Sequence, residues 1–318
     1  LTSQAGGRFF AEDALGNRPY TGDVIQRTVK VAARTEGRDA GSVTVSAFGA
    51  MLDGSLDATR TVGPDQLAIR VRNTGPNSRE VIGAPRAGVV AIELLREPGS
   101  APMQAVDFVN GMVARSISAL TSLVSQPLLL SSDWFSSGGI GDFRLSGAGA
   151  VSLPASVQLQ LPATAHRDED GEWSDGARFS VSGTRIAIDG GIAAPGGRIA
   201  FRAQDVVGGA LDAEHHAIQV GSAAVLTTAG RWINDVPSGP AGYRAYSGGW
   251  IQLEAEGSLW LATGALLDVS AGAWMNANRA VALGEAGRLA VLSGEIPGAT
   301  MVLAGRLAGY GVRYGQSV

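Results

Sequence analysis

The chain has no cysteine and almost no lysine, and the first absence limits its chemistry most. Without thiols, the 318 residues cannot form a disulfide scaffold, use thiolate catalysis or build a cysteine-based zinc site. This composition fits a cytosolic protein, and it fits equally well a protein exported unfolded through a narrow pore, where a disulfide would block passage. Lys30 is the only lysine, so arginine supplies almost all positive charge, which we attribute to codon bias in a GC-rich genome.

Charge is scarce, at 17% of residues against about 25% in average soluble proteins. The net charge of −4 does not favour a nucleic acid or an anionic membrane, and we expect no nucleic-acid partner. No uncharged apolar run reaches about 18 residues, which argues against a membrane helix. The sequence starts at Leu1 without a methionine or a recognisable signal peptide, which predicts a fragment or a processed product.

Glycine, in contrast, is abundant. The chain has 45 glycines, about twice the usual share of roughly 7%. Glycine adopts positive φ at little cost and therefore favours tight turns. Apolar residues make up 45% of the chain, which is enough for a large core and argues against disorder. Together these deviations predict an all-β protein with many tight turns.

Short segments that alternate apolar with polar residues recur along the chain, and each predicts a half-buried strand. In WIQLEA (residues 250–255), Ile251 and Leu253 share one face, whereas Trp250 and Gln252 share the other. The same template returns at residues 41–47, 67–71, 141–147, 177–183, 197–203 and 287–293. A second unit, with Leu-Asp in a turn, recurs at residues 54–58, 209–213 and 264–272. A third short strand is expected between the two units, as at residues 185–190 and 258–262.

Where it is uninterrupted, the template returns roughly every 20 to 24 residues, as expected for solenoid repeats. One repeat cannot bury its own apolar side, so the repeats must stack, and parallel stacking pairs the backbone groups of all but the terminal turns. We therefore predict one coil, a solenoid, over residues 1–318. A β-sandwich or barrel is the alternative, although its strands would usually be joined by Asn-Gly or Asp-Gly hairpins.

Four segments break the period. Residues 167–177, 233–249 and 273–287 predict loops inserted between turns of the coil. Residues 73–141 predict a larger insertion. Within it, apolar residues at spacings of three and four predict an amphipathic helix near residues 104–125: Val106, Val109, Val113, Ile117, Leu120 and Val124.

No cluster of residues identifies a catalytic or cofactor site, so we expect no enzyme, no cofactor and no metal. The acidic loop at residues 168–175 does not have the spacing of an EF-hand, which favours a solvated loop. Adjacent side chains on a strand point to opposite faces, which argues against a metal site shared by His215 and His216. The repeated Asp57, Asp212 and Asp268 are typical of turn residues whose carboxylate accepts a backbone N–H.

Trp250 and Trp260 are the candidate surface residues. By alternation with their apolar neighbours, both side chains point outward. Exposed aromatic rings can form a flat platform for a sugar ring or for another protein. The alternative is that a loop or the next turn of the coil covers them.

The stretch GGWIQLEAEGSLWLATGALLDVSAGAW (residues 248–274), followed by GEAGRLAVLSGE, resembles the shaft of the filamentous-haemagglutinin-like exoproteins of two-partner secretion. Residues 40–72 and 130–318 carry the resemblance. It implies a right-handed parallel β-helix in a structural or adhesive segment, secreted or on the surface of a Gram-negative bacterium. The parent protein would be exported by an outer-membrane two-partner secretion transporter.

The implied binding partner is a glycan or protein on a host or neighbouring cell. The Asn-Pro motifs of the family's secretion domain do not occur here, which indicates an interior shaft segment. The second hypothesis is a β-helical polysaccharide lyase or hydrolase. Such enzymes share the coil, but they need clustered acids, or a basic residue beside bound calcium, and the sequence has no such cluster.

Overall fold

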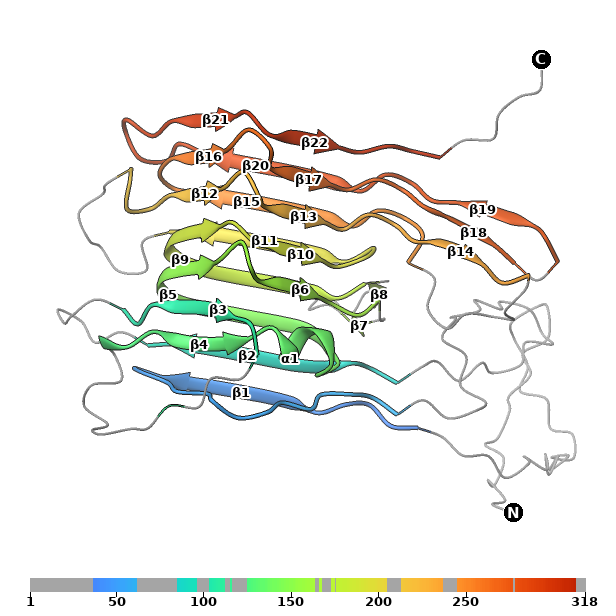
Figure 1. The fold of residues 1–318 in the computed structure, drawn as a ribbon, viewed down its shortest axis with the longest axis horizontal. Coiled ribbons are helices and arrows are strands. Elements are labelled where there is room, and N and C mark those ends of the chain that lie inside the picture. The colour runs from blue at the N-terminus through green and yellow to red at the C-terminus, as the bar shows by residue number, and fades with distance from the viewer. Residues whose placement is uncertain are drawn as a thin grey trace, which may run out of the picture.

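The computed structural model describes residues 37–61, 85–95, 103–111, 115, 125–163, 166–167, 173–174, 176–204, 213–236, 245–276 and 278–312. Nearly all regular structure in these residues is β, and the main sheets are parallel, so the prediction of an all-β protein is confirmed. The strands lie in layers, from β1 at one end of the stack to β21 and β22 at the other (Figure 1).

Within the described residues, twelve strands form the largest sheet. Seven follow one another across it in chain order: β1 (Ser42–Ala47), β2 (Gly88–Leu94), β5 (Ile140–Leu153), β9 (Arg178–Ile188), β11 (Arg198–Ala203), β15 (Trp250–Ala255) and β20 (Arg288–Ser293). The other five are β3 (Val106–Val109), β4 (Leu128–Ser131), β12 (Ile218–Val220), β16 (Leu259–Leu261) and β21 (Met301–Leu303).

A second parallel sheet also runs in chain order, through β6 (Gln158–Gln160), β10 (Gly191–Ala193), β13 (Val225–Thr227), β17 (Leu266–Asp268) and β22 (Arg306–Ala308). Two small sheets complete the described β-structure: β14 (Trp232–Asn234) with β18 (Ala273–Met275) and β19 (Val281–Leu283), and β7 (His166–Arg167) with β8 (Trp173–Ser174). One short helix, α1 (Asp133–Ser136), follows β4.

From β5 onward the chain alternates between the two large sheets, and each return adds a strand parallel to an earlier one in the same sheet. Six of the seven predicted template strands are observed, as β1, β5, β9, β11, β15 and β20. The seventh, at residues 67–71, lies outside the described residues. With β2 between β1 and β5, these strands pair in parallel with their neighbours in chain order, which is not the hairpin pattern expected of a sandwich.

The register of strand pairing aligns similar residues of successive strands in rows across each sheet. The rows that point inward form the core. One row runs through Val90, Phe143, Phe179, Ile199 and Ile251. The second sheet contributes a row of Leu159, Ile192, Leu226 and Leu267. All of these side chains are at most 1% exposed. The interior is therefore continuous from strand to strand, and no single strand could bury it alone.

The long strand β5 changes its pairing halfway along. Its register with β9 shifts between Leu145 and Ala148. Gly147, within the shift, has a φ of 72°, and a Cβ at this position would clash with the carbonyl oxygen of Leu94. Glycine is required here because L-residues with a side chain rarely adopt this conformation. The bulge lets one strand contribute to two successive parts of the sheet.

The helix predicted near residues 104–125 is wrong over Val106–Val109, which form strand β3. Val106 and Phe108 point into the core while Asp107 lies between them half-buried, so the local period is two rather than 3.6. Residues 112–114 and 116–124 lie outside the described residues. The insertion expected at 73–141 also contains β2, which lies between β1 and β5 in the largest sheet, so this part belongs to the stack.

The predicted loops contain some regular structure. Residues 273–287 include β18 and β19, which pair antiparallel, and β18 also pairs in parallel with β14. Residues 167–177 include β8, which pairs antiparallel with β7. These small sheets are separate from the two large parallel sheets.

The layer formed by β20, β21 and β22 is uncovered. Within the described part of the chain, each of these strands pairs on one side only. Its inward-row residues Met301, Leu303 and Leu307 are 42%, 45% and 46% exposed, whereas their partners Leu259, Leu261 and Leu267 belong to the layer beneath. Leu259 and Leu261 are fully buried by comparison. The apolar pattern therefore continues into a layer that nothing in the described residues covers.

Candidate functional site

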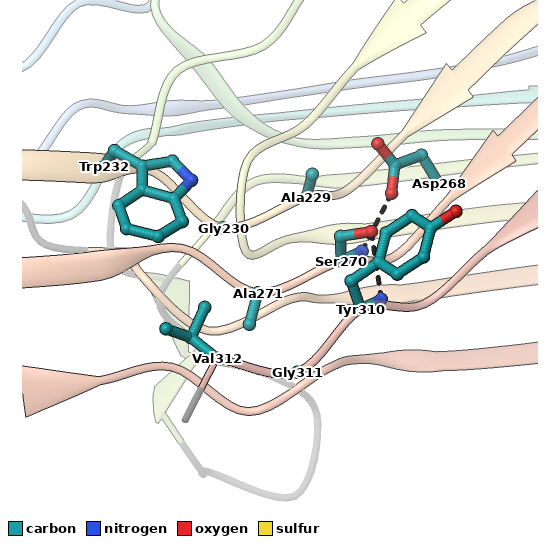
Figure 2. Close-up of a pocket in the computed structure, with 9 residues that line it drawn as sticks. All are labelled: Ala229, Gly230, Trp232, Asp268, Ser270, Ala271, Tyr310, Gly311 and Val312. Atoms are coloured by element: carbon teal, nitrogen blue, oxygen red, sulfur yellow. Dashed lines mark hydrogen bonds between the residues drawn. The ribbon is translucent and has the colours of Figure 1, made fainter. Parts of the chain in front are cut away.

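A groove of about 650 Å³ lies on the side of the stack, where three consecutive layers of the chain run next to one another. Figure 2 shows its lining residues, which come from the start of β14 and the segment before it, from the end of β17 and the segment after it, and from the segment after β22. They are Ala229, Gly230, Trp232, Asp268, Ser270, Ala271, Tyr310, Gly311 and Val312. The groove is open to solvent rather than enclosed.

Backbone hydrogen bonds fix the relative positions of the three segments. The N–H of Gly230 donates to the carbonyl oxygen of Ser270 at 2.8 Å, and the N–H of Ala271 donates to that of Tyr310 at 2.7 Å. The groove is therefore a feature of the ladder itself. Glycine and alanine line its floor, so the backbone is open to a ligand between the larger side chains.

Two aromatic side chains form the sides of the groove. Trp232 is 72% exposed and Tyr310 is 61% exposed, and they stand on opposite sides of the small floor residues (Figure 2). Neither ring contributes much to the core. Exposed aromatic rings can contact a sugar ring or another protein.

The strand that carries Trp232 is anchored behind the groove. The indole N–H of Trp274 on β18 donates to Oδ2 of Asp235 at 2.8 Å, and Asp235, directly after β14, is only 2% exposed. Tyr246 stacks on Trp274 with ring centroids 6.3 Å apart. These contacts hold β14 in place, while the indole of Trp232 makes no recorded hydrogen bond in the described structure.

A chain of polar groups runs across the groove. Asp268 accepts the N–H of Ser270 through Oδ1 at 2.9 Å, and the hydroxyl oxygen of Ser270 accepts the N–H of Tyr310 at 3.1 Å. Arg306 donates to the Tyr310 hydroxyl at 3.2 Å, and this bond raises the pKa of Arg306 above its ordinary value. Within the described residues, Oδ2 of Asp268 has no hydrogen-bond partner, so it can accept from a ligand.

The turn role predicted for the repeated aspartates is confirmed at two positions. Asp268 accepts the Ser270 N–H, as described above, and Asp57 accepts both the N–H and the hydroxyl of Thr59, at 2.9 and 2.6 Å. These two hydrogen bonds lower the pKa of Asp57. Asp212 lies outside the described residues. Asp268 combines the turn role with a place in the groove.

Trp250 points outward, as predicted, but its ring faces are covered. Register places it between Arg198 on β11 and Arg288 on β20. The guanidinium carbons of these arginines lie 3.9 and 5.1 Å from the ring centroid, a cation–π arrangement on each side. The neighbouring layers, rather than a ligand, occupy the two faces of the indole. Neighbouring layers therefore cover Trp250, which was the alternative to a binding platform.

Trp260 also points outward and is half-buried, between Gln219 on β12 and Val302 on β21. It lies on β16, beyond the turn at residues 256–258, and Trp250 lies at the start of β15. The strand rises by about 3.3 Å per residue, so the length of β15 alone separates the two indoles by well over one ring width. The structure does not bring the two predicted contact residues together.

Sequence reasoning did not single out Trp232 and Tyr310. Trp232 begins a short strand after Gly230 and Arg231, a position like that of Trp250, and Tyr310 stands between two glycines. Both features are visible in the sequence. Their proximity is not, because it depends on the register of three layers that are far apart along the chain.

The remaining candidates do not form a site in the described structure. His215 is exposed while His216 is 5% exposed, so the adjacent histidines do face different ways. Within the described ranges, no group of three or more His, Cys, Asp or Glu residues is placed to hold a metal ion. The side chains of the acidic loop at 168–175 lie outside the described residues. No described helix has the length and apolar character needed to span a bilayer.

No protein-family model, curated protein or solved structure matches this chain. The resemblance to filamentous-haemagglutinin-like exoproteins therefore stays a prediction.

Proposed function

We propose that the chain is a segment of a right-handed parallel β-helix and serves as a structural and adhesive part of a large bacterial exoprotein. The parallel, in-register sheets support the coil, because a chain that alternates between two sheets and adds each strand beside the previous one must climb. Right-handedness follows the strong general preference for right-handed crossovers between parallel strands.

One observation carries this proposal: the layer of β20, β21 and β22 retains the inward apolar pattern but is uncovered. Exposing such a row in water is costly, at about 25 cal/mol per Å² of apolar surface. A further winding of the same type would bury Met301, Leu303 and Leu307 and would pair the open backbone edge. A shaft that continues beyond this layer therefore accounts for the exposure.

The composition supports export. A chain with no cysteine cannot form a disulfide during passage through a pore. Each layer contacts mainly its neighbours, so windings can form one after another as the chain emerges, as in other repeat proteins. The proposed location is the outside of a Gram-negative cell, reached through an outer-membrane two-partner secretion transporter. The groove with Trp232 and Tyr310 supplies the adhesive surface, toward a glycan or protein of another cell.

The test is made in the producing bacterium. An antibody raised against the purified chain should label intact cells or the medium, and external protease should remove the cell-bound signal. Deletion of the outer-membrane transporter gene adjacent to the exoprotein gene should retain the antigen inside, and its re-expression should restore export. Antigen that is found only after the cells are permeabilised, with the transporter present, would contradict the proposal.

A further inference from the structure

We propose that the groove between Trp232 and Tyr310 binds an uncharged hexopyranose unit of a glycan. This inference names a ligand class for the adhesive part of the proposed function and rests on it to that extent. Its physical basis is the combination of two exposed aromatic sides, a floor of small residues and a row of polar groups on one ladder.

The aromatic sides suit a sugar ring. A hexopyranose has C–H groups on its faces and hydroxyls at its rim, so it can pack one face on an aromatic ring while its rim remains available for hydrogen bonds. Trp232 and Tyr310 present their rings at opposite sides of the floor in Figure 2. A sugar lying between them would contact an indole on one side and a phenol on the other. Binding would remove from water two of the largest exposed apolar surfaces in the described chain.

The polar groups match the rim of the ring. Oδ2 of Asp268 can accept a hydrogen bond from a sugar hydroxyl, because only Oδ1 is used by the turn. The hydroxyl of Ser270 accepts from Tyr310 and still has its own proton to donate. Buried or half-buried hydrogen bonds to a carboxylate are among the stronger ones that a neutral ligand can make.

Charge selects an uncharged ligand. Asp268 is the only charged residue among those that line the groove, and its carboxylate would repel a uronate or a sulfated sugar. Arg306 is near enough to interact with the charge of Asp268, but its guanidinium donates to the hydroxyl of Tyr310 and does not line the groove. Apart from the indole N–H of Trp232, the side chains that line the groove present hydroxyls and a carboxylate, which suits neutral hydroxyl groups.

The groove crosses three layers, and Tyr310 belongs to the outermost of them, directly after β22. In a longer coil, the next winding on β20, β21 and β22 would therefore adjoin the Tyr310 side of the groove.

The experiment uses the purified 318-residue chain and saturation-transfer NMR titrations with cellotetraose, β-1,4-galactotetraose and mannotetraose as neutral probes, and with tetragalacturonate as the anionic probe. We expect saturable binding of at least one neutral probe with a Kd on the order of 1 mM and no binding of tetragalacturonate. Trp232→Ala and Tyr310→Ala should each weaken binding by at least about tenfold. Trp260→Ala removes an outward indole elsewhere on the stack and should leave binding unchanged.

Asp268→Asn removes the negative charge but keeps the turn, because the amide oxygen can still accept the Ser270 N–H. It should weaken binding of the neutral probe by roughly three- to tenfold without a change in circular dichroism.

The proposal is overturned if the folded wild-type chain binds none of the three neutral probes, if it binds only tetragalacturonate, or if Trp232→Ala binds as well as the wild type. Export is read on intact cells and sugar binding on purified protein, so failure of one does not imply failure of the other. If the antigen is labelled outside the cell but the purified chain binds no sugar, the sugar-binding proposal is refuted and the shaft proposal is retained.

Discussion

Replacing Phe179 tests whether the rows of inward residues hold the layers together. Phe179 is completely buried on β9 and lies at the centre of a cluster of aromatic rings. Its ring centroid is 5.3 Å from Phe143, 5.6 Å from Phe135, 5.7 Å from Phe201 and 5.8 Å from Phe108. These four partners come from β5, α1, β11 and β3, so one side chain connects several layers.

Phe-to-Ala changes in protein cores cost about 3 to 5 kcal/mol in free energy of unfolding. Four aromatic partners place Phe179→Ala at the upper end, about 5 kcal/mol, because aromatic pairs contribute beyond their burial. With a urea m-value of about 3 kcal/mol/M, the unfolding midpoint should fall by roughly 1.7 M. The matched control is Phe48→Ala, since Phe48 is 49% exposed and should cost less than about 1 kcal/mol.

Urea unfolding followed by circular dichroism gives the midpoints, and hydrogen exchange locates the damage. Protection should be lost first in β5, β9 and β11, because each layer of a repeat structure depends mainly on its neighbours. Equal midpoint shifts for Phe179→Ala and Phe48→Ala would refute the continuous core on which the fold argument depends.

Two further predictions concern local features. Arg115 donates a hydrogen bond to Asp53 at 2.7 Å, and this bond lowers the pKa of the Asp53 carboxyl. The pair therefore stabilises the fold above pH 3.8, the ordinary pKa of the group, and this stabilisation is lost as the pH falls through the lower pKa of the folded state. Asp53→Asn should therefore reduce the urea midpoint at pH 6 and match the wild type near pH 2, whereas Asp39→Asn, in an exposed pair, should change little at either pH. Gly147→Ala should destabilise by more than about 2 kcal/mol in thermal and urea unfolding, because of its positive φ and the clash, whereas Gly41→Ala meets no atom and should be nearly neutral. A midpoint gap for Asp53→Asn that persists in acid, or equal effects of the two glycine changes, would count against these accounts.

The template strands could be predicted because they have one buried face and one solvated face. In β15 the burial alternates strictly, and the sequence WIQLEA alternates with it. The strands that were missed lack this contrast. β2 has the sequence GVVAIEL, in which two of the three outward positions, Val89 and Ala91, are also apolar, and β3 is short and continues into apolar residues with helical spacing. Here the parallel neighbours decide the structure, as they do in buried parallel strands generally.

The site was harder to predict, because exposure depends on residues one or two layers away. Alternation correctly places Trp250 and Trp260 outward, but only the register shows that Arg198 and Arg288 cover Trp250. The same local pattern occurs at Trp232, whose register partner is Ala273, a small residue that leaves the indole uncovered. The size of the neighbour in the next layer therefore separates a packed surface tryptophan from an exposed one.

Trp250 and Trp232 should also differ in how much each contributes to stability. Trp250 contacts two arginines of neighbouring layers, so its removal should lower stability by the cation–π contributions of about 0.5 to 1 kcal/mol each. Trp232 is 72% exposed and makes no recorded hydrogen bond in the described structure, so its removal should leave stability within about 0.5 kcal/mol. A tryptophan that contributes little to folding and stands beside an open groove is free to contact a ligand, as the proposed sugar site requires. The groove residues can therefore change while the coil is retained, because the inward rows carry the stability.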